Sequence, residues 1–141
     1  MAFKMHKVQV WSAEVPDRPG AAAAKLEVLA RAGADLEFIF TRPLPDHPDN
    51  MMVFLAPITE ANQVQAAQSV GFQPARDIAM LCVEGDNRTG LGYEIMSRLA
   101  IAGVNLRGLS ISAVGNRFAA YLAFDNPDVV TQAIQVLAGV P

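Results

Sequence analysis

The chain has 141 residues, of which 52% are hydrophobic and 18% are charged, and it carries a formal net charge of -3. This length and apolar content allow one large domain or two small ones and exclude a disordered chain. The acidic balance argues against nucleic acid as a partner, because binding a phosphate backbone requires a basic surface. The mean hydropathy of +0.24 leaves apolar surface to spare, so we expect a homo-oligomer, most simply a homodimer.

Nothing in the sequence indicates export or membrane anchoring. The first ten residues include Lys4, His6 and Lys7 and do not form the apolar region of a signal peptide. The most alanine-rich stretch, Ala21 to Ala32, is too short to span a bilayer. A single cysteine, Cys82, excludes an internal disulfide and suits a reducing compartment. We therefore expect a cytoplasmic protein.

The sequence repeats itself after 70 positions, which is the separation of Arg18 and Arg88. The same shift, without a gap, aligns Gly20 with Gly90, Leu29 with Leu99, Ala32 with Ala102, Gly33 with Gly103 and Leu36 with Leu106. It also aligns conservative pairs such as Asp17 with Asn87 and Asp35 with Asn105. We therefore predict a duplicated supersecondary unit, with residues 1–72 as the first repeat and residues 73–141 as the second.

Both repeats contain the same predicted elements in the same order. In the first repeat these are a strand at Val8 to Val15, a helix at about Gly20 to Ala32, strands at Asp35 to Arg42 and Met51 to Pro57, and a helix at about Glu60 to Val70. In the second they are a strand at Ile78 to Glu84, a helix at Gly90 to Ala102, strands at Asn105 to Ala113 and Phe118 to Phe124, and a helix at Pro127 to Ala138.

Helix ends are marked by their usual residues. Gly33 and Gly103 stand where a residue in the left-handed conformation ends the first helix of each repeat. Asn126 stands where its side chain can cap the start of the last helix. Right-handed crossovers between such elements predict an α+β fold. We expect two ferredoxin-like βαββαβ repeats packed side by side, each an antiparallel sheet with both helices on one face, and we expect the other face to be a dimer interface.

Two strand-to-helix turns offer a place for ligand chemistry. They read Val-Pro-Asp-Arg-Pro-Gly, ending at Gly20, and Gly-Asp-Asn-Arg-Thr-Gly, ending at Gly90. A glycine at a helix start lets another group approach the backbone, and the free N–H groups there favour an anion such as a carboxylate. The alternative is that Asp17 and Asn87 cap the helices while the glycines tighten the turns.

Each turn is followed by a helix and then by Ala-Gly-Ala-Asp-Leu in the first repeat or Ala-Gly-Val-Asn-Leu in the second. Over nearly the whole chain this pattern resembles the ACT domain family of amino-acid-binding regulatory modules. The sequence departs from the family at three places. Thr89 replaces the usual proline, Asp35 replaces asparagine, and Ala21 to Ala24 replace larger apolar residues.

The two ends of the first helix are too far apart to share a small ligand within one repeat. A helix of about 13 residues rises roughly 20 Å, so Asp17 and Asp35 should lie at opposite ends of their repeat. The resemblance to ACT pairs implies sheets joined edge to edge, with two sites between the repeats. The first site then contains Asp17, Arg18 and Gly20 with Asn105 and Leu106, and the second contains Asn87, Arg88 and Gly90 with Asp35 and Leu36.

In each of these sites, backbone N–H groups and the asparagine amide would hold a carboxylate, and the aspartate would hold an ammonium group. Arg18 and Arg88 either join the site or point to solvent.

An enzyme is not expected, because the chain has no G-x-S-x-G, H-E-x-x-H or P-loop motif. Cys82 is expected in the core, and Asp46, His47 and Asp49 are expected to form a solvated loop, with no metal or cofactor. We therefore expect a non-catalytic regulatory or sensor protein that binds an amino acid and signals by allostery. The alternative is an interaction or scaffold subunit that has kept the ACT-like fold and lost the ligand.

Overall fold

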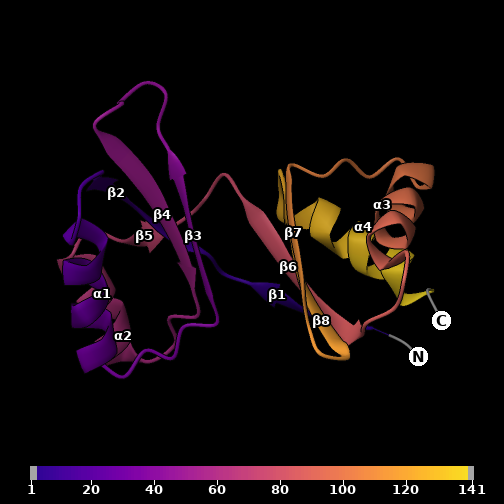
Figure 1. Ribbon diagram of the computed structural model, residues 1–141, viewed down its shortest axis with the longest axis horizontal. Coiled ribbons are helices and arrows are strands. Elements are labelled where there is room, and N and C mark those ends of the chain that lie inside the picture. Colours follow the sequence, from indigo (N-terminus) through magenta and orange to yellow (C-terminus); the bar gives the residue numbers. More distant parts are fainter. Residues whose placement is uncertain (1–2, 140–141) are drawn as a thin grey trace. The chain divides into compact units, whose positions relative to one another are not determined.

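The computed structural model describes residues 3–139. Its elements, in chain order, are β1 (Lys4–Val8), β2 (Trp11–Pro16), α1 (Ala21–Arg31), β3 (Phe38–Pro43), β4 (Asn50–Ala56), α2 (Ala61–Ser69), β5 (Gln73–Pro74), β6 (Ala79–Asp86), α3 (Leu91–Ile101), β7 (Gly108–Val114), β8 (Arg117–Phe124) and α4 (Pro127–Ala138) (Figure 1). Every strand and helix placed from the sequence is present. However, β2, β3 and β7 each begin three residues later than predicted.

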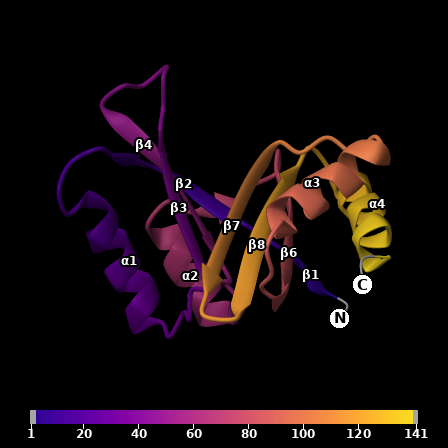
Figure 2. The same cartoon turned by 45° about the vertical axis from the view of Figure 1, so that its right-hand side comes forward.

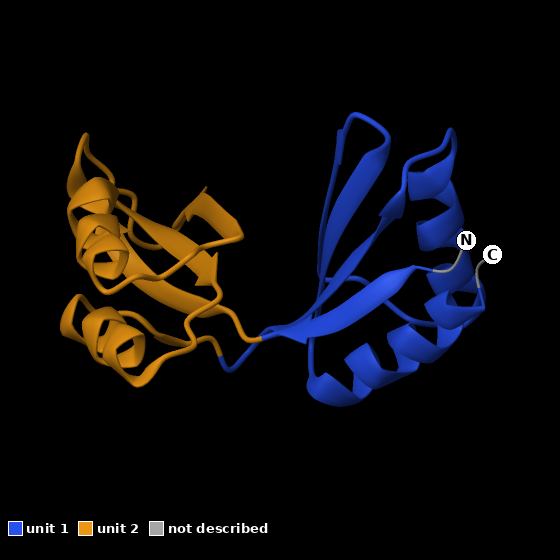
Figure 3. Ribbon diagram, turned by 90° about the horizontal axis from the view of Figure 1, so that it is seen from below, with its two compact units in different colours: residues 1–8, 76–141 blue, residues 9–75 orange. Residues whose placement is uncertain are grey.

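The chain forms two compact units, which Figure 3 colours separately. Unit 2 consists of Gln9–Ala75, and unit 1 combines the residues up to Val8 with those from Arg76 onward. Each unit contains one four-stranded antiparallel sheet, in the order β3-β4-β2-β5 in unit 2 and β1-β6-β8-β7 in unit 1. The predicted α+β fold class, with two ferredoxin-like units, is confirmed.

Unit 2 follows the predicted βαββαβ order within one continuous segment. Alternate residues of β2 face α1 and α2, so Trp11, Ala13 and Val15 are buried in one core together with Leu29 and Phe72. This alternation is the period expected of a strand that has one face on a core. The short strand β5 pairs with β2 and completes the sheet.

Unit 1 completes its sheet with the N-terminal strand. β1 runs antiparallel to β6, from the pair Lys4↔Glu84 to the pair Val8↔Met80, at the edge position that β5 holds in unit 2. The predicted division after residue 72 assigns β1 to the first repeat, whereas the structure places β1 in the same unit as the second repeat. β1 belongs there because Phe3, just before the strand, is buried in the core of unit 1 and Met5 packs against that core.

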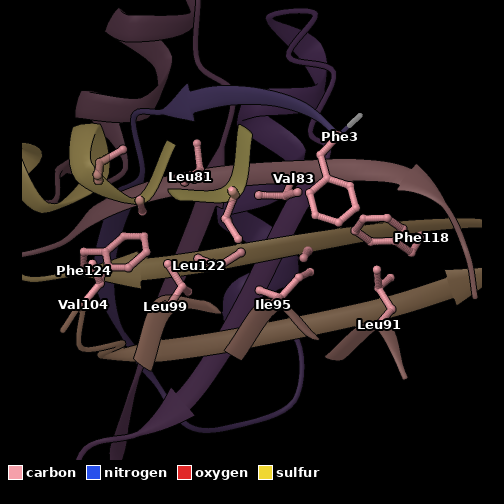
Figure 4. Packing of buried hydrophobic residues seen from close by; sticks show 14 residues of the cluster. Phe3, Leu81, Val83, Leu91, Ile95, Leu99, Val104, Phe118, Leu122 and Phe124 are labelled. Atoms are coloured by element: carbon pink, nitrogen blue, oxygen red, sulfur yellow. The ribbon is translucent and has the colours of Figure 1, made fainter. Parts of the chain in front are cut away.

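The core of unit 1 lies between its sheet and the helices α3 and α4, which cover one face (Figure 2). Figure 4 shows side chains from both layers meeting: Phe3, Leu81, Val83, Phe118, Leu122 and Phe124 come from the sheet side, Leu91, Ile95 and Leu99 come from α3, and Val104 follows that helix. The same alternation as in unit 2 therefore produces a second, separate core.

Other details of the sequence prediction are confirmed. Cys82 is 2% exposed, as expected of a core residue. The Asn126 side chain accepts a hydrogen bond of 3.1 Å from the N–H of Val129 at the start of α4, and Gly139 ends that helix. Among residues 3–139, no helix combines the length and apolar character that a bilayer crossing requires.

The attachment of β1 can be tested at the aromatic contact that anchors it. The Phe3 and Phe118 rings meet edge to face with centroids 5.5 Å apart. Such pairs contribute about 1 kcal/mol beyond area burial. We expect Phe3→Leu and Phe118→Leu to show a coupling of about 1 kcal/mol in a double-mutant cycle measured by urea unfolding. Additive effects would contradict the placement of Phe3 on this ring.

Candidate functional site

The two strand-to-helix turns have the same backbone geometry. Gly20 and Gly90 have φ of 84° and 83°, the left-handed region that glycine enters without strain. The N–H of Ala21 bonds to the carbonyl of Arg18 at 3.3 Å, and the equivalent bond in the second turn, from Leu91 to the carbonyl of Arg88, has the same length. The duplication seen in the sequence therefore extends to the conformation of the turns.

The helices that follow these turns begin without a side-chain cap. The residues before α1 and α3 are the glycines themselves, and neither helix start has a side-chain cap hydrogen bond. Asp17 and Asn87 are held by their backbone N–H groups, which donate to the carbonyls of Asp49 at 2.8 Å and Asn116 at 2.6 Å. The alternative of capping side chains is therefore wrong, and the helix N-termini keep their dipole and N–H groups for another acceptor.

The other predicted contact region lies where each first helix ends. Gly33, with φ of 82°, donates to the carbonyl of Ala30, and Ala34 donates to that of Leu29, at 3.0 and 3.1 Å. Gly103 and Val104 repeat the pattern at 3.0 and 2.8 Å after α3. This left-handed helix end places Asp35 and Asn105 in exposed positions before β3 and β7. It also explains why both strands begin later than predicted.

Within each unit, the structure keeps the two predicted contact regions apart. α1 and α3 have eleven residues each, a rise of about 16 Å. Asp17 and Asp35 therefore lie at opposite ends of α1, and Asn87 and Asn105 lie at opposite ends of α3. The pairing of a turn from one unit with a strand start from the other remains a prediction.

Two predicted site residues belong partly to the cores. Leu36 packs against the core of unit 2 and Leu106 against that of unit 1. Both are half-buried, so only part of each side chain faces outward. Their main effect is to anchor the exposed residues that precede them, Asp35 and Asn105.

The turn arginines differ between the repeats. Arg88 forms an ion pair of 2.6 Å with Glu94 in the first turn of α3, and its guanidinium lies 6.0 Å from the centre of the Phe3 ring. Arg98 approaches the same carboxylate at 4.0 Å. Arg18 is exposed, and within residues 3–139 no carboxylate lies within 4.0 Å of it. α1 has no acidic residue in its first turn, so the two turns present different charges to a ligand.

Sequence reasoning did not identify Gln63, which lies beside the Asp35 region. Gln63 is 7% exposed and is the one buried polar or charged residue in the part of the chain that the structure describes. Its Nε2 donates to the carbonyl of Gly33 at 3.1 Å, and its Oε1 accepts from the N–H and hydroxyl of Thr59. The signal available in the sequence was a glutamine in the first turn of a predicted helix, where such side chains fold back on the helix start.

The loop with Asp46, His47 and Asp49 serves a structural role. His47 Nδ1 lies 3.2 Å from a carboxylate oxygen of Glu14, and Asn50 donates to the other oxygen at 2.5 Å. These hydrogen bonds lower the pKa of the Glu14 carboxyl, and the bond from Asn50 has the larger effect. No cluster of three or more metal-binding side chains occurs within residues 3–139.

The comparisons with known proteins concern the fold. No protein family profile and no curated protein sequence matches the chain. Among solved structures, a protein from Bacteroides thetaiotaomicron aligns over 94% of this chain and 88% of its own, with a TM-score of 0.75 and 14% identity.

The ligand-free regulatory subunit of aspartate kinase from Thermus thermophilus aligns over 97% of both chains, with a TM-score of 0.63 and 16% identity. Aspartokinase III of E. coli, in complex with lysine and aspartate, aligns over 97% of this chain and 33% of its own, with a TM-score of 0.54 and 15% identity. The expected tandem ACT-domain fold is thereby confirmed.

The conformation of the turns can be tested with two glycines that are two residues apart. A Cβ on Gly90 would meet nothing within 4 Å, so Gly90→Ala should cost only the left-handed strain, about 1–2 kcal/mol. Gly92 lies inside α3 with ordinary φ, and its added Cβ would meet Ile111 at an ordinary 3.7 Å. We expect Gly92→Ala to stabilise the protein by up to about 1 kcal/mol, measured by urea unfolding. Equal effects of the two changes would contradict the turn geometry.

Proposed function

We propose that this protein is a non-catalytic regulatory protein that binds a free amino acid at sites formed between its two repeats. The observation that carries this proposal is the pair of uncapped helix starts, each preceded by a left-handed glycine in an exposed turn. A helix start of this kind attracts a carboxylate, and every free amino acid has one.

The first site has the better-prepared anion position. The N–H groups of Ala22 and Ala23 precede the first i→i−4 bond of α1, which runs from Ala24 to the carbonyl of Gly20 at 3.0 Å. These two groups and the exposed Arg18 side chain would bind the carboxylate. Asp17, on the same turn, would bind the ammonium group, as a charge-assisted hydrogen bond.

Asn105 would complete the first site from the other repeat. Its exposed amide can donate to the carboxylate and accept from the ammonium group. The second site would combine Asn87, Arg88 and Gly90 with Asp35 and Leu36. There Glu94 places a negative charge at the helix start and already pairs with Arg88, so we propose weaker carboxylate binding at the second site.

The comparisons suggest which ligands to try first. Regulatory subunits of aspartate kinase share this fold over nearly their whole length, and an aspartokinase of E. coli forms a complex with lysine and aspartate. Lysine and aspartate are therefore the first candidates. We propose that the bound amino acid shifts the equilibrium between two arrangements of the protein, which a partner protein distinguishes by affinity.

We also propose that the protein acts as a homodimer in the cytoplasm. Edge strands β3 and β7 expose apolar side chains, including Ile39, Leu109 and Val114, which a second subunit would bury. The second candidate function is a scaffold that binds no ligand. The Arg88–Glu94 ion pair favours it, since this pair neutralises Arg88 and places a carboxylate at one helix start without a ligand.

Thermal unfolding in the presence of each of the twenty amino acids tests the proposal. A ligand that binds the folded state alone adds RT ln(1 + [L]/Kd) to stability, about 2.7 kcal/mol at a hundredfold excess over Kd. We expect one or a few amino acids to raise Tm. We expect Asn105→Ala to remove most of this rise while leaving the Tm of the free protein nearly unchanged, because Asn105 is exposed.

Asn116→Ala is the matched control, since Asn116 is also an exposed asparagine of unit 1. Its contact with Asn87 uses the backbone carbonyl, which alanine keeps. Asn87→Ala should reduce the ligand-induced rise less than Asn105→Ala does. The absence of any rise at millimolar concentrations would contradict the proposal and support the scaffold.

A further inference from the structure

Gln63 joins two helices of unit 2 at the point where α1 ends. Its Oε1 accepts from the N–H of Thr59 at 3.1 Å, which fixes the side chain on its own helix start. Its Nε2 donates across to the carbonyl of Gly33 at 3.1 Å. The neighbouring Asn62 donates to the carbonyl of Ala32 at 2.9 Å, so the first turn of α2 binds two consecutive carbonyls of the α1 exit.

The other repeat shows that the fold itself does not need this contact. The residue before α2 is Glu60 and the one before α4 is Asn126, so Gln63 and Val129 hold the same position in their helices. Val129 packs as an apolar residue against its core. The exit of α3 nevertheless forms the same backbone hydrogen bonds as the exit of α1. Gln63 makes the hydrogen bonds that its burial requires, but its bond to Gly33 adds a contact that the other repeat does without.

The segment that Gln63 holds leads directly into the proposed second site. Gly33 is followed within two residues by Asp35, which would bind the ammonium group of the ligand. The backbone between them is exposed at Gly33 and Asp35, and it is otherwise held by the bond from Ala34 to the carbonyl of Leu29. A carboxylate that must meet a ligand in one geometry gains affinity when its backbone is fixed in advance.

We infer that Gln63 is a positioning residue for amino-acid binding, which fixes the Gly33–Asp35 backbone so that the Asp35 carboxylate is aimed at the ligand. This inference rests on the proposed function, because it assigns Asp35 to a ligand site. The equivalent residue of the other repeat, Val129, has no side-chain hydrogen-bonding group, so it cannot bind the segment before Asn105 in this way. Loss of Gln63 therefore affects one site and spares the other.

The test uses the full chain with Gln63→Glu. A glutamate keeps the acceptor for Thr59 and removes the donor to Gly33. The change therefore separates the role of residue 63 at the start of α2 from its bond to the α1 exit. Gln63→Val, which copies the other repeat, is the second variant in case a buried carboxylate unfolds the protein. Gln65→Glu makes the same charge change on the exposed face of α2 and is the control.

Two measurements are made on each variant. The first is amide hydrogen exchange, without ligand, at Ala34 and Glu37. Their N–H groups donate to the carbonyls of Leu29 and Ala56. The second is an NMR titration with the standard amino acid that raises the Tm of the unaltered chain most. We expect exchange at these amides to rise about tenfold, and we expect the Kd read from the Asp35 amide to rise about tenfold, as for loss of one hydrogen bond. The Kd read from Asn105 should not change.

If the Gln63 hydrogen bonds only stabilise the packing of the two helices, the pattern is different. In that case both Kd values remain at those of the unaltered chain in Gln63→Glu and Gln63→Val, which overturns the inference. If no amino acid binds the unaltered chain, the proposed function fails, and hydrogen exchange alone then tests whether Gln63 fixes this segment. Faster exchange at Ala34 and Glu37 then supports the fixing of this segment by Gln63, and unchanged exchange overturns it.

Discussion

The constraint on which the rest of the structure depends is the left-handed glycine at each end of the first helix of each unit. Gly20 and Gly33 bracket α1, and Gly90 and Gly103 bracket α3. These residues determine where the chain turns into the helix and where it leaves, about 16 Å apart. A free amino acid cannot reach both ends. If it uses the turn and the strand start together, as the ACT resemblance implies, it must bind between two copies, and the duplication supplies the second copy within one chain.

The two copies share this geometry but have diverged in the residues around it. Glu94 pairs with Arg88 at one helix start, whereas the other start, at α1, has no acid in its first turn. Gln63 binds the α1 exit, whereas Val129 leaves the α3 exit to its own backbone bonds. In the sites proposed above, the first would therefore have an open anion position and the second a fixed carboxylate. We propose on this basis that the two sites differ in affinity.

Much of the fold was predictable because it depends on local patterns. Alternation placed the strands, and the glycines and Asn126 placed the helix ends. The placement of β1 in unit 1 was not predictable from the sequence. The alternation of Phe3 and Met5 suits the edge of either sheet, and only the packing of Phe3 against Phe118 selects the sheet of unit 1. For the same reason the sequence predicted the turn residues of the proposed site but not Gln63, whose bond to Gly33 joins residues thirty positions apart.

The central claim is that one bound amino acid contacts both repeats. Nuclear Overhauser contacts from a ¹³C-labelled amino acid to the protein amides test it most directly. The account predicts that one bound molecule at the first site gives contacts to the N–H groups of Ala22 or Ala23 and also to Asn105. Contacts confined to residues of a single unit would contradict it.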